Sequence, residues 1–123
     1  MSRKRGSAAA EPLMPTREVG KVLTEIVEER KRQLAKWGEQ DHPSTNGSDH
    51  IVAFWRTAPQ LRPFFQRRAD EAAARGDLTW ADILLEEVFE ALAEDDVKPL
   101  RAELVQVAAV VVAWIENLDR RAK

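Results

Sequence analysis

The chain has 123 residues, of which 44% are hydrophobic and 33% are charged, and its formal net charge is −2. This length and composition fit one soluble domain, and the near-zero net charge gives no field that would attract nucleic acid or an anionic membrane. Because cysteine is absent, disulfides, thiolate nucleophiles and thiolate metal ligands are excluded, so any metal must bind oxygen or imidazole.

The N-terminal stretch contains basic, Ser, Ala and Pro residues but lacks the apolar run of a secretory signal. We interpret residues 1–15 as a disordered leader and residues 16–123 as a single domain. The longest uncharged run in the second half, residues 104–115, is far shorter than the roughly 20 residues that span a bilayer. These features predict a cytoplasmic protein without a membrane partner.

Residues 16–37 are predicted to form a helix, because their apolar side chains recur at helical spacing and Gly38 supplies a stop. Residues 38–50 are rich in Gly, Pro, Asn, Ser and Asp, which is typical of a loop. This loop holds His42 and His50. We interpret both as solvated rather than as metal ligands, because no further imidazole or Cys completes a zinc set, and the loop is a candidate to close over a substrate.

Residues 51–75 are predicted to form one or two short helices, interrupted where Pro59 and Pro63 remove backbone donors and ended by Gly76. No segment alternates convincingly with period two, so no strand is expected. The sequence therefore predicts an all-α protein, a helical bundle built on an antiparallel helical hairpin and completed by oligomerisation.

That hairpin consists of the last two predicted helices. Thr79 is a good N-cap, and Asp82 gives a weak variant of the capping box, so a helix is predicted from Thr79 to about Glu94. Pro99 suits the first turn of a final helix that ends near Asp119.

Acidic residues of the first hairpin helix lie opposite its apolar residues, a pattern typical of a solvated amphipathic helix. The final helix favours another interpretation. Glu103 and Gln106 lie at the start of a stretch that is apolar around nearly its whole circumference and is expected to be buried. A carboxylate in such a position needs a partner.

Residues equally distant from the midpoint of an antiparallel hairpin lie side by side, which pairs Glu90 with Glu103 and Glu87 with Gln106. The two pairs are one helical turn apart, so four oxygen-bearing side chains are expected to converge. Like charges in a partly buried place raise each other's pKa unless a cation neutralises them. Hard oxygen ligands that leave room for water and substrate phosphates are what Mg²⁺ prefers.

The stretches LLEEVFEAL and RAELVQVAA resemble the EExxE and ExxD motifs of the MazG-like nucleoside triphosphate pyrophosphohydrolases, an all-α family. The stretch EERKRQLAKWGEQDHP is similar to the first helix and loop of small phage and actinobacterial members. The resemblance covers about residues 27–121 and is weakest over residues 51–75. It implies that Glu87, Glu90 and Glu103 bind Mg²⁺, for which Mn²⁺ is a possible substitute.

At the fourth position of the pattern, Gln106 stands where the family has Asp. An amide oxygen can bind Mg²⁺, but it adds no negative charge and cannot act as a base. The resemblance further implies hydrolysis of a nucleoside or deoxynucleoside triphosphate to the monophosphate and pyrophosphate, a reaction that cleans the nucleotide pool. Glu86 or Glu87 is expected to orient or deprotonate the attacking water.

Trp37, at a helix end beside a polar loop, is the best candidate to stack on a nucleobase, while Trp55, Trp80 and Trp114 are interpreted as packing residues. Phosphate contacts need cations. The basic candidates near the predicted site or its approaches are Arg30, Lys36, Lys98 and Arg101.

The apolar surface of residues 104–115 exceeds what one companion hairpin can cover, which predicts a homo-oligomer, either a dimer or a tetramer. An alternative function is a non-catalytic α-helical oligomer that binds nucleotide or a divalent cation, or a module that presents an acidic surface to a protein. Gln106 is the best support for this alternative. Release of pyrophosphate from a panel of triphosphates distinguishes the two functions.

Overall fold

The computed structural model describes residues 17–45, 47 and 49–122, and the leader predicted for residues 1–15 lies outside them. The chain forms two compact units. The first combines residues 17–42 with residues 112–122, and the second comprises residues 43–111. The prediction of one domain over residues 16–123 stays a prediction.

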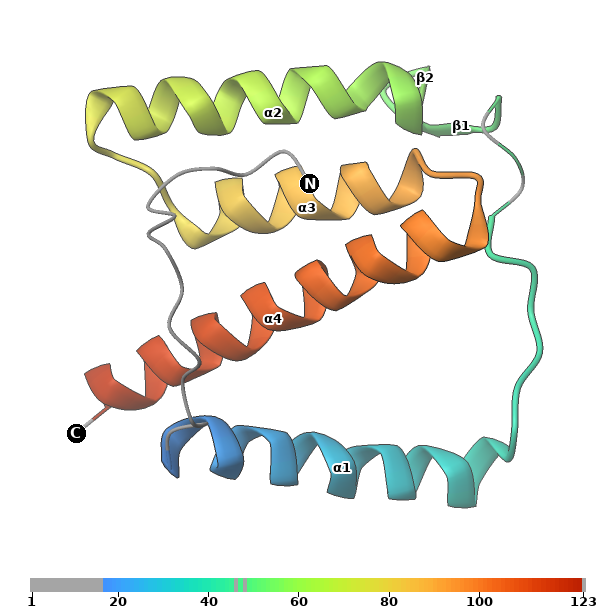
Figure 1. The fold of residues 1–123 in the computed structure, drawn as a ribbon, viewed down its shortest axis with the longest axis vertical. Coiled ribbons are helices and arrows are strands. Elements are labelled where there is room, and N and C mark those ends of the chain that lie inside the picture. The colour runs from blue at the N-terminus through green and yellow to red at the C-terminus, as the bar shows by residue number, and fades with distance from the viewer. Residues whose placement is uncertain (1–16, 46, 48, 123) are drawn as a thin grey trace. The chain divides into compact units, whose positions relative to one another are not determined.

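The described chain is mostly helical, in agreement with the predicted class (Figure 1). Its elements in order are α1 (Arg17–Trp37), β1 (Ile51–Ala53), β2 (Arg56–Thr57), α2 (Ala58–Arg75), α3 (Trp80–Leu92) and α4 (Val97–Arg121). The first unit contains α1 and the end of α4, and the second contains the remaining elements with the beginning of α4. Among the described residues, no helix has the length and apolar character needed to cross a membrane.

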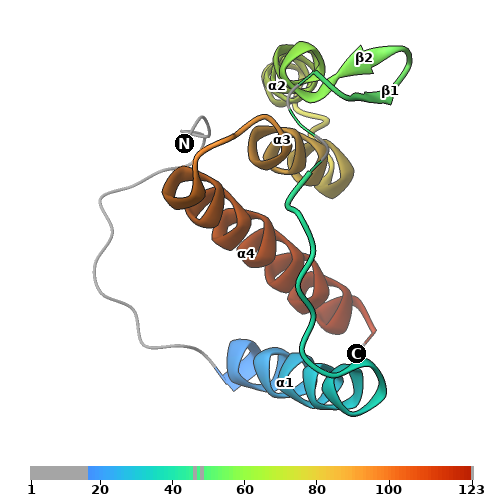
Figure 2. The same cartoon turned by 90° about the vertical axis from the view of Figure 1, so that its right-hand side faces the viewer.

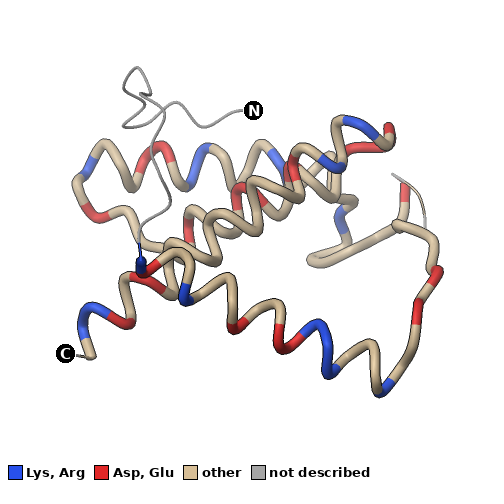
Figure 3. Tube along the Cα trace, turned by 60° about the horizontal axis from the view of Figure 1, so that its bottom comes forward, with Lys and Arg blue, Asp and Glu red and all other residues tan. Residues whose placement is uncertain are grey.

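In the first unit, α1 confirms the predicted helix of residues 16–37 to within one residue. Acidic and basic residues both lie along its length (Figure 3), and Arg32 lies 2.8 Å from Glu29 one turn away. Such pairs each stabilise a helix slightly. Val22 is buried and shares a small groove with Ile115 of α4. Gly38 follows the helix with a φ of 69° and donates its N–H to the Leu34 carbonyl at 2.8 Å.

The second unit corrects the prediction for residues 51–75. Two short strands, β1 and β2, pair antiparallel before α2 begins, and Figure 2 shows them projecting from the start of that helix. They are three and two residues long, too short for alternation to be recognised in the sequence. The residues between them, Phe54 and Trp55, both have positive φ values, 52° and 58°.

The two prolines do not divide α2, which is a single helix of 18 residues. Pro59 lies in the first turn, where a backbone N–H has no intrahelical acceptor to lose. Pro63 lies inside the helix and removes one helical hydrogen bond, but the helix continues because Leu61 and Phe65 are buried against α3. Gly76 ends α2 in a left-handed conformation, as predicted.

The core of this unit lies between α2 and α3, which run side by side in Figures 1 and 2. The rings of Phe65 and Phe89 stack with centroids 4.7 Å apart, and Leu61 and Ala58 complete the buried cluster. Contacts of this kind hold the two helices in one register and fix which face of α3 points away from α2.

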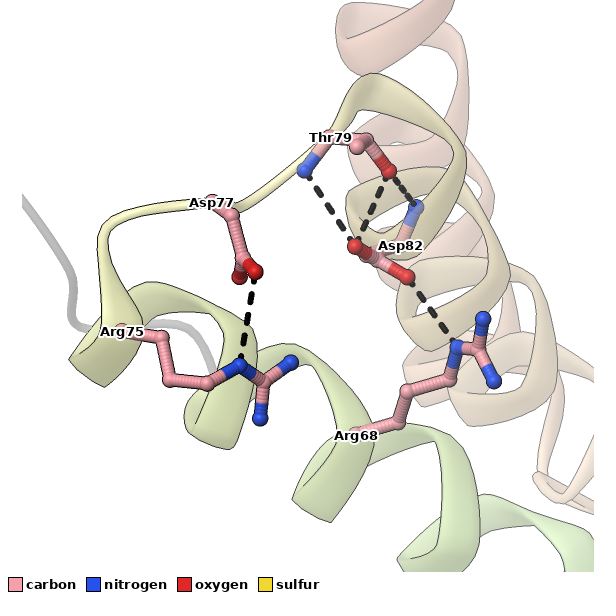
Figure 4. A network of polar contacts seen from close by, with 5 residues as sticks. All are labelled: Arg68, Arg75, Asp77, Thr79 and Asp82. Carbon is pink, nitrogen blue, oxygen red and sulfur yellow. Dashed lines mark hydrogen bonds and ion pairs between the residues drawn. The ribbon is translucent and has the colours of Figure 1, made fainter.

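The start of α3 is fixed by the predicted capping box (Figure 4). The Asp82 N–H donates to Thr79 Oγ1 at 3.1 Å, while the Thr79 N–H donates to Asp82 Oδ2 at 3.2 Å. Arg68 of α2 donates to the second oxygen of Asp82 at 3.2 Å. Burial raises the pKa of Asp82, but the hydrogen bonds from Thr79 and the charge of Arg68 outweigh it, and the net pKa is lowered. The carboxylate thus joins α3 to α2.

Candidate metal site

The acidic side of α3 is buried. Glu86, Glu87 and Glu90 are each 1% exposed, and they are among the largest fully buried side chains of the described chain. A solvated amphipathic helix would place these carboxylates in water, so that interpretation of the sequence pattern is wrong. The stacked Phe65 and Phe89 rings orient α3. On a helix that turns about 100° per residue, Glu87 lies on nearly the opposite side from Phe89, so packing Phe89 against α2 turns Glu87 away from that helix.

Three glutamates from the two hairpin helices converge. One carboxylate oxygen each from Glu87, Glu90 and Glu103 lies within 4.8 Å of the other two. Glu87 and Glu90 come from successive turns of α3, and Glu103 comes from α4, where it is also buried. The pairing of Glu90 with Glu103, predicted from equal distances to the hairpin midpoint, is therefore confirmed.

Glu90 has a strongly raised pKa. Burial, a hydrogen bond with Glu103 and the charges of Glu87 and Glu86 raise the pKa of Glu90 to about 7. Both oxygens of Glu90 are buried, and among the described residues no backbone N–H, amide, hydroxyl or basic group donates a hydrogen bond to them. A carboxylate in this environment is costly to ionise unless a cation lies beside it.

The donor set fits a hard divalent cation. All three side chains supply carboxylate oxygens, the ligands that Mg²⁺ and Mn²⁺ bind, and they are close enough to share one ion. Two or three protein carboxylates leave coordination positions for water and for substrate phosphates, as Mg²⁺ requires. Neither Cys nor His takes part in the cluster, which argues against a structural zinc site.

Gln106, the predicted fourth ligand, is half-buried and lies one turn after Glu103 on the same side of α4. Its pairing with Glu87 stays a prediction. Glu86, the other candidate for a catalytic carboxylate, is as deeply buried as Glu87, its neighbour in the chain.

The candidate substrate residues fall into two groups. Lys98 and Arg101 are exposed in the first two turns of α4, in the same unit as the glutamates. Arg30, Lys36 and Trp37 belong to α1 in the other unit. Arg30 donates to Gln33 at 2.7 Å, and the Lys36 ammonium lies 4.9 Å from the centroid of the exposed Trp37 ring. Substrate contacts by all five stay predictions.

Both loop histidines, His42 and His50, are exposed, as expected for solvated residues. Trp55, interpreted from the sequence as a packing residue, is instead 89% exposed at the turn between β1 and β2. Sequence reasoning missed this aromatic turn. The signal that could have revealed it is the run of five apolar residues in IVAFWR, which is too short for a core helix and directly precedes the Thr57 cap.

Comparisons of the chain with protein-family models, with curated proteins and with solved structures find no match.

Proposed function

We propose that this protein is a Mg²⁺-dependent nucleoside triphosphate pyrophosphohydrolase of the MazG-like type, which converts a nucleoside or deoxynucleoside triphosphate to the monophosphate and pyrophosphate. The observation that carries the proposal is the convergence of Glu87, Glu90 and Glu103 in a buried cluster. Evolution retains buried like charges against stability where a function requires them. The same three residues occupy the matching positions of the motifs that resemble the family.

Glu87, Glu90 and Glu103 would hold the metal ion, with the Gln106 amide oxygen as a neutral fourth group. Bound Mg²⁺ supplies neutralisation of the triphosphate and of the departing pyrophosphate. The role of the protein is to keep these carboxylates close together and largely out of water, so that their attraction for a cation is screened less than on a surface.

Glu86 is the best candidate to orient or deprotonate the attacking water. It is buried beside the cluster, and it is not among the three side chains whose oxygens converge. A carboxylate that is not committed to the metal can accept a proton from water. Glu87 is the second candidate for this role. Lys98 and Arg101 would contact the phosphates, because both are exposed basic residues near the beginning of α4.

A panel of nucleoside triphosphates, assayed for pyrophosphate release with Mg²⁺ and with EDTA, tests this function. The expected result is Mg²⁺-dependent release of pyrophosphate, with the monophosphate as the second product. Release of inorganic phosphate instead would place the cleavage at a different bond and contradict the proposal.

Gln106 favours a second candidate, a non-catalytic oligomer that binds nucleotide or a divalent cation. In place of a fourth acid it offers an amide, which has neither charge nor basicity. Binding of Mg²⁺ and nucleotide without any release of pyrophosphate would support this alternative.

A further inference from the structure

A second candidate binding site lies on the other side of α3, between α2, α3 and the β1–β2 hairpin. It is a groove of about 810 Å³ whose apolar lining includes the rings of Phe54, Phe64, Phe65 and Phe89. That volume is within the range of pockets that hold small ligands. Leu85 and Phe89 of α3 face this groove, whereas Glu87 and Glu90 converge with Glu103 of α4. The groove is therefore separate from the candidate metal site.

The charge on the groove is positive. Arg56, Arg67 and Arg68 line it, and among the residues that the structure describes no Asp or Glu does so. Arg68 is engaged by Asp82 at 3.2 Å. Arg56 and Arg67 form no ion pair or hydrogen bond with any other described side chain. Two guanidinium groups that have no ion-pair partner among the described residues, beside an apolar groove, favour an anionic ligand, and guanidinium matches the geometry of a phosphate.

The turn beside the groove carries two aromatic side chains at a conformational cost. Phe54 and Trp55 both occupy the left-handed region, which side chains other than Gly, Asn and Asp rarely adopt. They are 77% and 89% exposed, so the conformation gains little packing in return. Strained backbone that presents exposed aromatic rings is characteristic of binding sites, and flat rings of this kind stack on nucleobases.

We propose that this groove binds a free nucleotide, with the base against the Phe54 and Phe64 rings and the phosphate at Arg56 and Arg67, and that binding needs no divalent cation. Among the described residues, the lining combines aromatic surface with the guanidinium groups of Arg56 and Arg67 and contains no Asp or Glu, which complements an aromatic anion. The site is distinct from the hydrolytic site proposed above and does not depend on it.

Titration of the full-length protein with AMP in EDTA tests the proposal, with calorimetry for affinity and tryptophan fluorescence to report on Trp55. Saturable binding with a Kd on the order of 1 mM or tighter is expected. Adenosine and inorganic phosphate are expected to bind about tenfold more weakly or worse, because each makes only half of the contacts. Failure of AMP to bind, or binding only with Mg²⁺, would overturn the proposal.

Two variants with a matched control locate the ligand. Arg67→Ala is expected to weaken AMP binding about tenfold or more. Arg62→Ala, on the same helix but not among the groove residues, is expected to leave it unchanged. Phe54→Gly removes a ring and also relieves the left-handed strain, so it is expected to weaken AMP binding without lowering the melting temperature. Weaker AMP binding at an unchanged melting temperature would show that a ligand contact is lost while the fold stays intact.

Three results would contradict the location or the ligand. Equal losses of AMP affinity in Arg62→Ala and Arg67→Ala would indicate non-specific electrostatic attraction. Loss of AMP binding in Glu90→Gln would place the nucleotide at the glutamate cluster. A short single-stranded oligonucleotide that binds tightly while AMP does not would show that the surface recognises nucleic acid rather than a free nucleotide.

Discussion

Glu90 of α3 and Glu103 of α4 bring carboxylate oxygens to within 4.8 Å of each other, and both side chains are buried. Two ionised carboxylates at this separation repel each other strongly in a medium of reduced dielectric. Either a proton or a cation must therefore accompany them.

Replacing Glu90 by Gln is expected to abolish Mg²⁺-dependent turnover and to weaken Mg²⁺ binding, because the amide removes a negative charge from the centre of the cluster. The apo fold is expected to stay intact or to become slightly more stable, since the substitution relieves like-charge repulsion. Calorimetric Mg²⁺ titration, pyrophosphate release and thermal melting measure the three effects. Glu94→Gln, just beyond the end of α3, is the control. Unchanged Mg²⁺ affinity in Glu90→Gln would show that the cluster does not bind the ion.

Replacing Gln106 by Asp is expected to tighten Mg²⁺ binding, because it would add a fourth carboxylate, which the predicted hairpin pairing puts beside Glu87. Gln106→Asn is the matched control, since Asn has the size of Asp without the charge. Calorimetric Mg²⁺ titration of both variants separates the effect of the added charge from the effect of the shorter side chain. If Asp and Asn give the same Mg²⁺ affinity, the pairing of residue 106 with Glu87 is wrong.

The stability of the metal-free protein is expected to depend on the protonation of Glu90. Its folded pKa of about 7 lies above the ordinary value of 4.5, so between these values the folded state binds more protons than the unfolded chain. The contribution of Glu90 is then most favourable below about pH 4.5 and is lost as pH rises through 7, with a slope of at most about 1.4 kcal/mol per pH unit.

Urea denaturation in EDTA, at intervals from pH 5 to pH 8, measures this dependence. The slope is expected to be shallower in Glu90→Gln, and Mg²⁺ is expected to restore stability at the alkaline end, because the ion binds the ionised carboxylates. Identical pH profiles for the wild type and Glu90→Gln would contradict the assignment of the proton to this cluster.

The capping box is expected to contribute measurably to the stability of the α2–α3 unit. Thr79→Ala removes the acceptor for the Asp82 N–H and a hydroxyl that donates to the Asp82 carboxylate at 2.9 Å, at a cost of about 1 kcal/mol. Thr24→Ala is the control, because Thr24 is exposed on α1 and donates only to the Gly20 carbonyl within that helix. The denaturant midpoints of the two variants measure both changes in stability. Equal effects of the two substitutions would show that the cap contributes nothing specific.

Assembly into a dimer or tetramer is expected, with the first part of α4 at the interface. Leu104 and Val105 are exposed on this helix in the single chain, and apolar side chains of this size are commonly covered by another subunit. Light scattering is expected to show an oligomer at micromolar concentration and a shift toward monomer for Leu104→Glu. Lys98→Glu, in the first turn of the same helix, controls for the added charge. A wild-type protein that is entirely monomeric would contradict the prediction.

The sequence by itself determined the helices at α1, α3 and α4 and the cap at Thr79, because periodic apolar residues and capping side chains act over one or two turns. It also predicted the meeting of Glu90 with Glu103, since an antiparallel hairpin fixes which residues are equally distant from its corner. These are local properties of the chain, so they can be read without knowing what packs against what.

Only the tertiary structure decided which side of α3 is buried. The pattern of acidic and apolar residues on that helix is compatible with a solvated face, and the burial of Glu86, Glu87 and Glu90 depends on α3 having neighbours on more than one side. The same holds for α2, where burial of Leu61 and Phe65 carries the helix through Pro63. The helix propensity of one residue contributes less free energy than the burial of a core side chain. Contacts with a distant part of the chain therefore outweigh the local sequence preference.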